Sequence, residues 1–262
     1  MNDDSTASEQ RLIRLESVRN QGRATHVQSK ILRREDITED LWLIWIEKPE
    51  GFIFKAGQYC TIGHDGVERA YSIVSAPHEE TLELFIELVP LPDGVLTPKL
   101  WELGVGNTVS IRPRAKGRFV FKPSLPNQLL VATVTGVVPY VSFVRDYFHA
   151  NKTGHHFYII EGASYKNELV YDTELAALAT EHPDMITYIP TLSRPTEERN
   201  AGWSGETGRA NEVVESWITD LGLFPEDTIV YACGHPGMIE DVKAKLLPRG
   251  FPLEEERFWK QD

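Results

Sequence analysis

The hydrophobic rhythm of this 262-residue chain changes once, at a short stretch with two prolines, residues 122–127. Before it, short apolar runs separated by frequent glycine and proline turns predict antiparallel strands in a sandwich or small barrel. After it, buried-strand patterns alternate with helical patterns, which predicts a doubly wound parallel sheet. We therefore expect two domains, residues 21–123 and 128–262, preceded by a disordered or loosely attached tail, residues 1–20.

Charge and composition exclude several classes of function. The chain has 27 lysines and arginines against 39 aspartates and glutamates, a net charge of −12, so nucleic acid is an unfavourable partner. Its two cysteines, Cys60 and Cys233, are too few for a zinc or iron–sulfur site of their own, and we expect no metal. No apolar run reaches the roughly 18 residues of a membrane span, and residues 1–10 do not resemble a secretory signal. We expect a cytoplasmic protein with no membrane contact.

The pattern of the second half indicates where a ligand would bind. It predicts strands over residues 128–133, 157–160, 185–190 and 228–231, and helices over 140–148, 172–179, 211–217 and up to about 247. Ligands of an open parallel sheet bind beyond the carboxyl ends of its strands. Two such ends, residues 133–139 and 233–238, carry a glycine and a helix-opening proline. Each also fits a plain strand-to-helix turn, and Cys233 also fits a small core residue.

One strand of the first half has an unusual polar face. Residues 81–89 alternate, with leucines and an isoleucine on one face and Glu83 and Glu87 on the other. Phe85 interrupts the acidic face, so it is either exposed or covers a ligand. A helix is expected over residues 97–103 and a strand over 109–112. The mixed charges of residues 30–40 predict a solvated loop or strand edge.

Residues 69–75 form an Arg-x-Tyr-Ser-x-x-Ser pattern with the side chains that a flavin site needs. Arg69 offers a guanidinium to a diphosphate, Tyr71 offers a ring that can stack on a planar cofactor, and Ser72 offers a hydroxyl. Residues 94–97 follow at the start of the expected helix, where free backbone N–H groups can donate hydrogen bonds to phosphate oxygens. The pattern therefore indicates a site for a planar cofactor with phosphate groups.

These motifs, in this order, resemble those of the ferredoxin/flavodoxin–NADP⁺ reductases of the compact bacterial type. The anchors are residues 57–59, 69–75, 94–97, 135–136 with Pro139, 192–194, 208–209, 233–236 and 258–259, spread over nearly the whole chain. The resemblance implies an antiparallel six-stranded FAD-binding barrel followed by a doubly wound parallel-sheet NADP-binding domain. It also implies an oxidoreductase that transfers a hydride between NADP(H) and FAD, and single electrons between FAD and ferredoxin or flavodoxin.

The resemblance assigns the FAD site to residues of both halves. Arg69 is expected at the diphosphate, Tyr71 on the isoalloxazine, and Ser72 near flavin N5, the atom that receives the hydride. The other expected FAD residues are Ala70, Phe85, Val95, Leu96, Thr97, Thr135, Phe258 and Trp259. Phe258 would cover the second flavin face, with Trp259 behind it, and would move aside for the nicotinamide. Ser72, Cys233 and Phe258 are the expected catalytic residues.

The NADP(H) site is implied in the same way. Its expected residues are Thr135, Gly136, Ser164, Arg194, Arg209, Cys233, Gly234, Pro236 and Asp241. Arg194 and Arg209 would bind the 2′-phosphate, although each also fits a surface charge. Ser164 stands where some relatives carry a third arginine, which would weaken NADPH binding by ~1 kcal/mol. Val134 and Val138 replace small residues in the nicotinamide loop, which would slow nicotinamide access or shift the loop.

The expected electron carriers, ferredoxin and flavodoxin, are acidic, so docking needs a local basic patch. Arg112, Arg114, Lys116 and Arg118 provide one, although they also fit an ordinary basic loop. We expect a monomer. Two alternatives stay open: another NAD(P)H-dependent flavin or oxygenase reductase of the same fold, and a flavin-binding sensor that does not turn over. The cysteine count excludes the fused iron–sulfur module of many oxygenase reductases.

Overall fold

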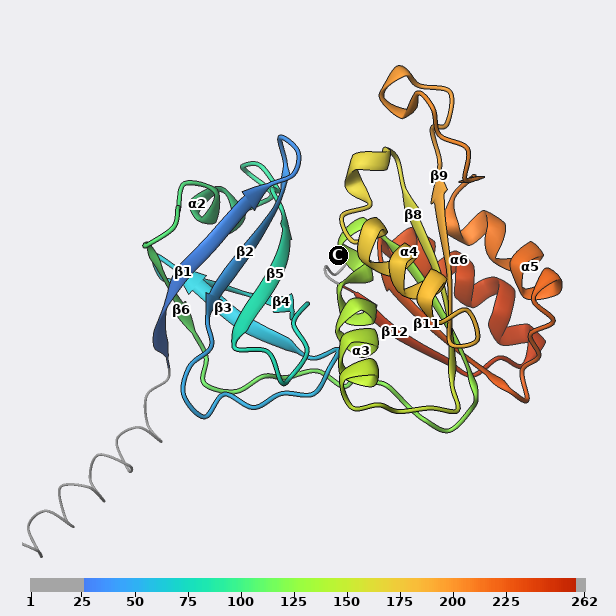
Figure 1. Cartoon of the computed structure of the whole chain (residues 1–262). Coiled ribbons are helices and arrows are strands. Elements are labelled where there is room, and N and C mark those ends of the chain that lie inside the picture. The colour runs from blue at the N-terminus through green and yellow to red at the C-terminus, as the bar shows by residue number, and fades with distance from the viewer. Residues whose placement is uncertain (1–25, 258–262) are drawn as a thin grey trace, which may run out of the picture.

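The computed structural model describes residues 26–257, which form two β-sheet domains side by side (Figure 1). The first sheet has the strand order β4-β3-β6-β1-β2-β5, with every neighbouring pair antiparallel. Its strands are β1 (Val27–Asp36), β2 (Leu41–Glu47), β3 (Tyr59–His64), β4 (Val67–Ser72), β5 (Thr81–Glu87) and β6 (Thr108–Ile111). The Val74 N–H, just after β4, donates to the Glu83 carbonyl on β5 at 2.9 Å. This bond joins the two edges, so the sheet curls into a nearly closed barrel.

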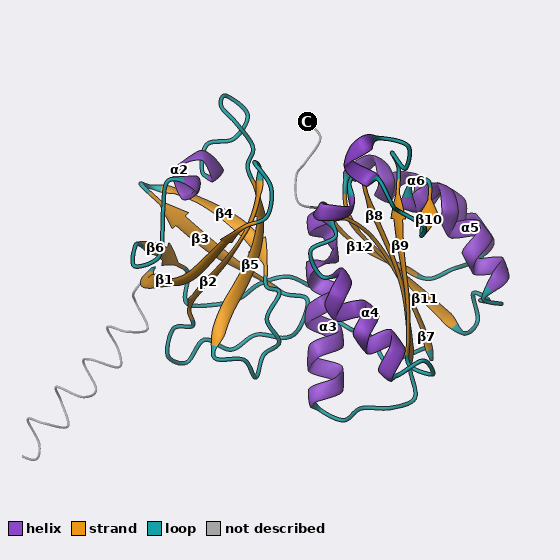
Figure 2. Cartoon of the chain, turned by 45° about the horizontal axis from the view of Figure 1, so that its top comes forward, coloured by secondary structure: helices purple, strands orange, loops and turns teal. Residues whose placement is uncertain are grey.

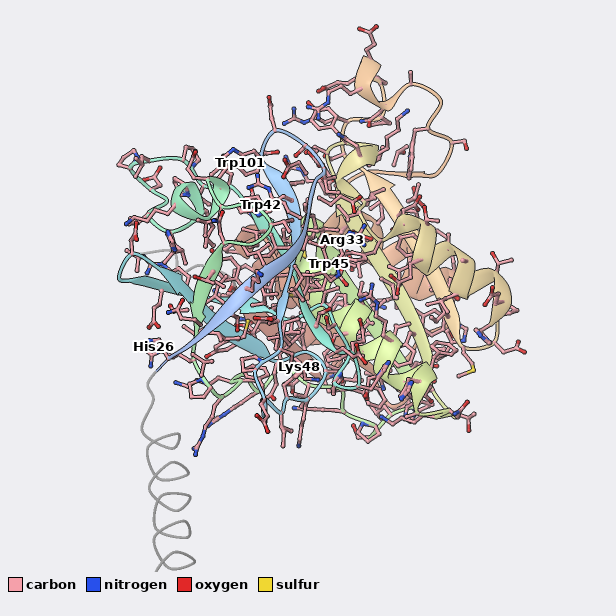
Figure 3. All side chains as sticks on the ribbon, turned by 60° about the vertical axis from the view of Figure 1, so that its left-hand side comes forward. His26, Arg33, Trp42, Trp45, Lys48 and Trp101 are labelled. Atoms are coloured by element: carbon pink, nitrogen blue, oxygen red, sulfur yellow. The ribbon has the colours of Figure 1, made fainter. Side chains whose placement is uncertain are left out.

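The alternation along β5 fills the inside of this barrel. Leu82, Leu84 and Ile86 are fully buried and pack against apolar side chains of β2. At one end, Trp101 of the short helix α2 (Thr97–Trp101) meets Trp42 edge to face, with ring centroids 4.8 Å apart (Figure 3). The helix therefore closes that end of the barrel with an aromatic contact.

Strand β1 differs from the expectation for residues 30–40. It pairs with β6 on one side and β2 on the other, so it is neither a loop nor a sheet edge. Most of its side chains are exposed nevertheless. An antiparallel sheet can be wet on one face, so a strand with mixed charges can occupy an interior position of the sheet. The charges correctly indicated solvent exposure but not the backbone pairing.

The second sheet is parallel and has the strand order β10-β9-β8-β7-β11-β12 (Figure 2). Its strands are β7 (Asn127–Thr133), β8 (His156–Ala163), β9 (Ile186–Leu192), β10 (Glu206–Thr207), β11 (Thr228–Gly234) and β12 (Leu253–Arg257). Its helices are α3 (Val138–His149), α4 (Asp172–Glu181), α5 (Ala210–Asp220) and α6 (Pro236–Leu246). The predicted doubly wound sheet is confirmed. Within residues 26–257, no helix has the length and apolar content that a bilayer crossing requires.

The order of the parallel strands locates a crevice. The chain proceeds from β7 through β8 and β9 to β10 at one edge, then returns to β11 beside β7 and ends at β12. The topology therefore reverses between β7 and β11. Loops leave these two strands in opposite directions, which opens a crevice beyond their carboxyl ends. Thr133 ends β7 and Gly234 ends β11, so both predicted strand-end motifs lie at this crevice.

The two domains share one apolar core. Helices α3 and α4 cover the sheet face toward the barrel, and α5 and α6 cover the other (Figures 1 and 2). The cluster under α3 and α4 continues into the barrel through Leu41, Leu43 and Phe85. A continuous buried interface of this kind holds two domains in a defined arrangement. Residues that lie far apart in sequence can therefore form one site between them.

Candidate functional site

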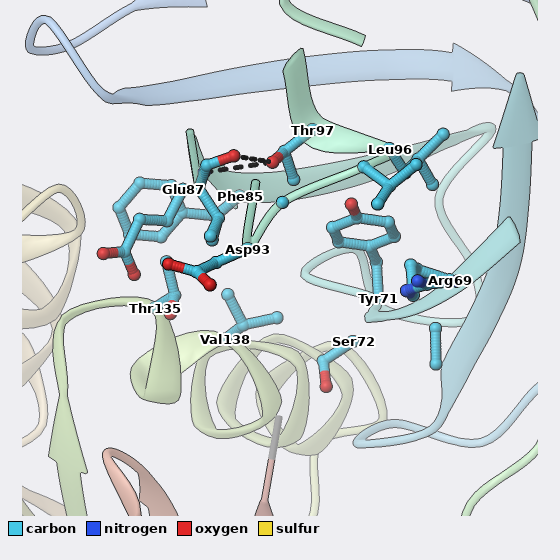
Figure 4. Close-up of a pocket in the computed structure, with 14 residues that line it drawn as sticks. Arg69, Tyr71, Ser72, Phe85, Glu87, Asp93, Leu96, Thr97, Thr135 and Val138 are labelled. Atoms are coloured by element: carbon cyan, nitrogen blue, oxygen red, sulfur yellow. Dashed lines mark hydrogen bonds between the residues drawn. The ribbon is translucent and has the colours of Figure 1, made fainter. Parts of the chain in front are cut away.

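A cavity of about 700 Å³ lies between the barrel and the start of α3 (Figure 4). It is lined by nine of the residues expected for the flavin: Arg69, Ala70, Tyr71, Ser72, Phe85, Val95, Leu96, Thr97 and Thr135. The fold brings these residues together from β4, β5, the loop before α2 and the loop after β7. Phe258 and Trp259 lie outside the described residues, so their expected position against the flavin stays a prediction.

Short-range bonds hold the loop that closes this cavity. The Thr97 hydroxyl donates to the Val89 carbonyl and accepts from the Val89 N–H, both at 3.0 Å. These bonds fix the start of α2 against the segment that follows β5, and the loop of residues 93–96 between them lines the cavity. Tyr71 and Phe85 present their rings from two different strands (Figure 4). Burial, the largest influence, raises the pKa of the Tyr71 phenol, so it stays protonated as a hydrogen-bond donor.

The lining of the first cavity fits a flavin that carries a diphosphate. Two aromatic rings can contact a planar ring system, and the hydroxyls of Ser72, Thr97 and Thr135 line the wall beside its polar edge. Arg69, an exposed side chain at the cavity wall, donates to the Glu68 carbonyl and keeps its other N–H groups for phosphate oxygens. These side chains therefore fit a ligand with a neutral ring system and an anionic tail.

A second cavity, of about 490 Å³, lies at the crevice between β7 and β11. Five residues expected for NADP(H) line it: Thr135, Ser164, Arg194, Arg209 and Gly234. Val134, which replaces a small residue in the expected nicotinamide loop, lines it as well. Thr135 and Glu87 line both cavities. The two cavities therefore adjoin, and groups bound in each would meet at these two side chains.

Glycines allow close backbone approach where β7 and β11 meet. A Cβ built on Gly136 would lie 2.2 Å from the Cys233 carbonyl oxygen, and one on Gly234 would lie 2.3 Å from Thr133 Oγ1. Gly234 also has a φ of 122°, which side chains rarely permit. The Thr133 hydroxyl accepts the His235 N–H at 2.8 Å and ties the two loops together. Gly136 thus shapes the crevice without lining it.

Three other expected nucleotide residues lie beside this cavity rather than in its wall. Cys233 is fully buried in the core shared with α3, and burial raises the pKa of its thiol well above the ordinary value. Pro236 begins α6 and is buried. Asp241 accepts from the Asn211 amide at 2.7 Å and forms an ion pair with Lys245 at 2.8 Å. The Asn211 side chain lines the cavity, so Asp241 reaches it through that neighbour. Their nucleotide roles stay predictions.

The far end of the second cavity is cationic. Arg194 and Arg209 lie there with Ser164 and are exposed. The Tyr165 hydroxyl accepts from Arg194 at 3.0 Å, and the Arg199 guanidinium lies 3.8 Å from the centre of its ring. One carboxylate joins them: Glu197 accepts from the Tyr165 hydroxyl at 2.7 Å and pairs with Arg194 at 3.6 Å. Tyr165 therefore orients a group of guanidinium ions beside the cavity. The pKa of Arg194 is raised, first by its bond to Tyr165.

Val134 occupies a strained backbone position between the two loops. Its φ is +44°, in the left-handed region that β-branched residues rarely adopt. The side chain is half-buried against the shared core and against a small cluster that includes Leu169 and Leu192. The resemblance implied that a β-branched residue at position 134 would restrict the backbone of this loop. The positive φ of Val134 is that restriction.

We expect Val134→Gly to change the free energy of unfolding by less than about 1 kcal/mol, although it removes a half-buried side chain. Relief of the left-handed strain, worth about 1–2 kcal/mol, offsets the lost packing and the greater chain entropy. Val137→Gly is the matched control, because Val137 is buried at an ordinary φ of −69° and should lose about 3 kcal/mol. Urea denaturation measures both, and equal losses would contradict the strain.

Two features of the site were missed from the sequence. Glu87 and Asp93 place carboxylates in the first cavity, although Glu87 is two residues after Phe85 and so shares its strand face. Arg145 of α3 donates to Glu83 of the barrel at 2.7 Å and makes paired bonds to Glu174 of α4 at 2.8 and 2.7 Å. The alternation of β5 could have indicated Glu87; no local signal indicates the Arg145 cluster.

Comparison with known proteins gives independent evidence for the family of this chain. Residues 130–244 match the oxidoreductase NAD-binding domain family. A ferredoxin–NADP reductase of Pseudomonas aeruginosa is 31% identical over 215 residues, covering 75% of this chain and 79% of that protein. A flavodoxin/ferredoxin–NADP reductase of Escherichia coli is 29% identical over 235 residues, covering 84% and 89%. A Neisseria gonorrhoeae ferredoxin NADP⁺ reductase, solved with bound FAD and NADP, superimposes with a TM-score of 0.77 at 26% identity, covering 90% and 100%.

The fold, the adjoining cavities and the NAD-binding domain match define a two-domain oxidoreductase. The sequence identity to the Pseudomonas aeruginosa enzyme, over most of both chains, establishes the family: the chain belongs to the ferredoxin–NADP reductase family. The family resemblance and the predicted barrel-plus-sheet fold are thereby confirmed.

Proposed function

We propose that this protein transfers a hydride between NADP(H) and FAD, and single electrons between FAD and ferredoxin or flavodoxin. The observation that carries the proposal is that the two cavities adjoin at Thr135 and Glu87. When bound, FAD supplies the chemistry, because it accepts two electrons as a hydride and releases them one at a time. The names of the relatives and the bound FAD and NADP of the Neisseria protein support this choice of cofactors.

The protein's part in this reaction is placement. Tyr71 and Phe85 would hold the ring system, and Arg69 would bind the diphosphate. Ser72, which is buried, would face the reacting edge of the ring. Arg194 and Arg209 would bind the 2′-phosphate that distinguishes NADPH from NADH. Burial at the junction would keep water away from the hydride. No acid–base pair is needed.

For the electron carrier we propose docking at the basic residues after β6. Arg112, Arg114, Lys116 and Arg118 are all exposed. Arg112 is paired with Glu68 at 2.6 Å, whereas the other three side chains form no ion pair with any of residues 26–257. Three free cations on an acidic chain would attract an acidic carrier locally, and this attraction would weaken with salt.

An anaerobic titration of the purified protein tests the proposal. We expect a yellow protein whose visible absorbance is bleached by NADPH, and by NADH only at much higher concentration, because NADH lacks the 2′-phosphate. A protein that retains flavin without bleaching would indicate a sensor, and equal bleaching by NADH would indicate another reductase of this fold. A colourless protein that takes up no FAD would contradict the proposal.

In a second arm of this experiment, ferredoxin and flavodoxin are the electron acceptors. Arg114→Glu with Arg118→Glu should lower the rate of carrier reduction and its salt dependence, and should leave bleaching by NADPH unchanged. Lys152→Glu, in the segment after α3 of the second domain, reverses a single charge and is the control. If the double variant kept both the wild-type rate and its salt dependence, the docking site would be wrong.

A further inference from the structure

Glu87 holds a carboxylate at the junction of the two cavities. It is the last residue of β5 and, with Thr135, is one of the two residues that line both cavities. Its side chain is half-buried, on the strand face that β5 turns toward the second domain. Figure 4 shows its carboxylate beside Phe85 and on the same side of the cavity as Asp93 and Thr135. A charge at this point lies where the contents of the two cavities would meet.

The carboxylate of Glu87 has no partner to neutralise it. Within the part of the chain that the structure describes, it forms no hydrogen bond and no ion pair. Glu83, on the same strand face, differs in this respect because Arg145 and Tyr171 bind both of its oxygens. A carboxylate that is partly removed from water and left without a counter-charge acts on its surroundings with little screening.

The charged groups around Glu87 are mostly acidic. Asp40 follows β1 and Glu168 lies after β8, and both negative charges act on Glu87. Asp93 shares the first cavity with it. Burial is the largest influence, followed by these two neighbours, and together they raise the pKa of Glu87.

The cations of the two cavities belong to their ends rather than to their junction. Arg69 lines only the first cavity, and Arg194 and Arg209 line only the second. None of them forms an ion pair with Glu87 among residues 26–257. The junction therefore has net negative potential when Glu87 is ionised, and a neutral acid when it is protonated.

We propose that the charge of Glu87 sets the reduction equilibrium of the flavin bound beside it, holding the flavin toward its oxidised form. This inference rests on the proposed function. A hydride from NADPH carries one proton and two electrons, so it leaves a positive charge on the nicotinamide ring of NADP⁺ and adds one negative charge to the flavin. A carboxylate at the junction opposes the negative charge on the flavin by direct repulsion.

The test is a reductive titration of the flavin-loaded protein against a dye of known potential, without nicotinamide, at pH 5 and pH 9. Glu87→Gln removes the charge and keeps the size of the side chain. At pH 9 we expect the reduction equilibrium of this variant to shift about tenfold toward reduced flavin, which is about 30 mV for a two-electron couple. Burial and the neighbouring carboxylates raise the pKa of Glu87, so protonation on going from pH 9 to pH 5 removes its charge and the two potentials should approach each other.

Three further variants separate charge from structure. Glu87→Asp keeps the charge and should stay within a few-fold of the wild-type equilibrium, whereas Glu87→Leu, which is also neutral, should shift like Glu87→Gln. Glu80→Gln is the matched control, since Glu80 is exposed at the other end of β5, roughly 20 Å away, and should have no effect.

Two outcomes are distinguishable. If the protein binds flavin but Glu87→Gln and wild type have the same potential at pH 9, or an offset that does not change with pH, the role of Glu87 is overturned and the proposed function stands. If the wild-type protein binds no flavin, the proposed function itself fails, and this inference fails with it.

Discussion

Replacement of Arg145 by methionine is expected to lower the free energy of unfolding by about 3 kcal/mol. Arg145 joins three elements: its guanidinium donates to Glu83 of β5 at 2.7 Å and to both oxygens of Glu174 in α4. Tyr171 donates to the other Glu83 oxygen at 2.9 Å. Glu83 is only 4% exposed, so loss of the guanidinium leaves a buried carboxylate with one neutral donor. Such an uncompensated charge is far more costly than a lost surface pair.

The same substitution should also slow hydride transfer. Burial lowers the pKa of Arg145, but Glu174 and Glu83 more than offset this and leave the pKa raised, so the guanidinium is charged at any accessible pH. Its bonds cross the domain interface beside Ser142, whose hydroxyl donates to the Ser75 carbonyl at 2.8 Å. These contacts fix the position of the second cavity relative to the first. A displacement of about 1 Å at a reacting centre can cost on the order of 10²-fold in rate.

Urea denaturation and stopped-flow reduction by NADPH measure the two effects. Lys152→Met is the matched control, because Lys152, which follows α3, forms an exposed pair with Asp146 of that helix at 3.0 Å and should contribute less than about 1 kcal/mol. Adding Glu83→Gln to Arg145→Met should restore part of the lost stability, since it removes the unpaired charge. Equal losses for Arg145→Met and the Lys152 control would contradict the structural role of this cluster.

The second large effect is a change in the pH dependence of stability through Glu161. This residue of β8 is fully buried; Tyr188 donates to one oxygen at 2.7 Å and the other oxygen has no partner. Burial, opposed by the Tyr188 bond and assisted by Asp172, raises the pKa of Glu161 from 4.5 to about 8. Below pH 4.5 the folded and unfolded states are both protonated. Between pH 4.5 and 8 only the folded state keeps the proton.

The folded protein therefore binds more protons than the unfolded chain across this window, and its free energy of unfolding falls as the pH rises. At about 1.4 kcal/mol per pKa unit, the loss from pH 5 to pH 9 is on the order of 4 kcal/mol. Glu161→Gln cannot ionise, so we expect it to be more stable than wild type at pH 9 by an amount of that order. At pH 5 it should be equal or slightly less stable, because its amide leaves one N–H without an acceptor.

Urea denaturation of both proteins at pH 5, 7 and 9 gives the comparison. The informative result is the divergence of the two stability curves as the pH rises, since other titrating groups affect both proteins alike. Glu181→Gln, at the exposed end of α4, is the control for the loss of a surface carboxylate. Parallel curves for wild type and Glu161→Gln would mean that Glu161 is ionised in the folded state at neutral pH.

Local pattern was sufficient for most elements. The predicted strand over residues 128–133 corresponds to β7, and the predicted helix over 172–179 to α4, each within one or two residues at its ends. Helix α3 begins at Val138, two residues before the predicted start, because Pro139 occupies its first turn and needs no amide partner there. Such ends depend on a few neighbouring residues, which is why the sequence predicts them well.

The burial of Glu83 is a property that the local sequence pattern does not predict. Its alternation with leucines predicts a solvated carboxylate, yet it is buried, because its partners Arg145 and Tyr171 lie 62 and 88 residues further along the chain. Glu87, two positions on, follows the same alternation but gains no partner and lines both cavities. The two carboxylates differ only in what the second domain places against them.

The sequence by itself therefore indicated an antiparallel half followed by a parallel α/β half, with most elements of the latter, because these follow from spacing along a strand and from local turn chemistry. The resemblance to a known family supplied the candidate flavin residues, nine of which line the first cavity. The tertiary structure alone decided that two cavities adjoin, that one glutamate is neutralised and another is not, and that Val134 is strained. Those properties depend on the distance between atoms of separate domains and loops, which no local pattern specifies.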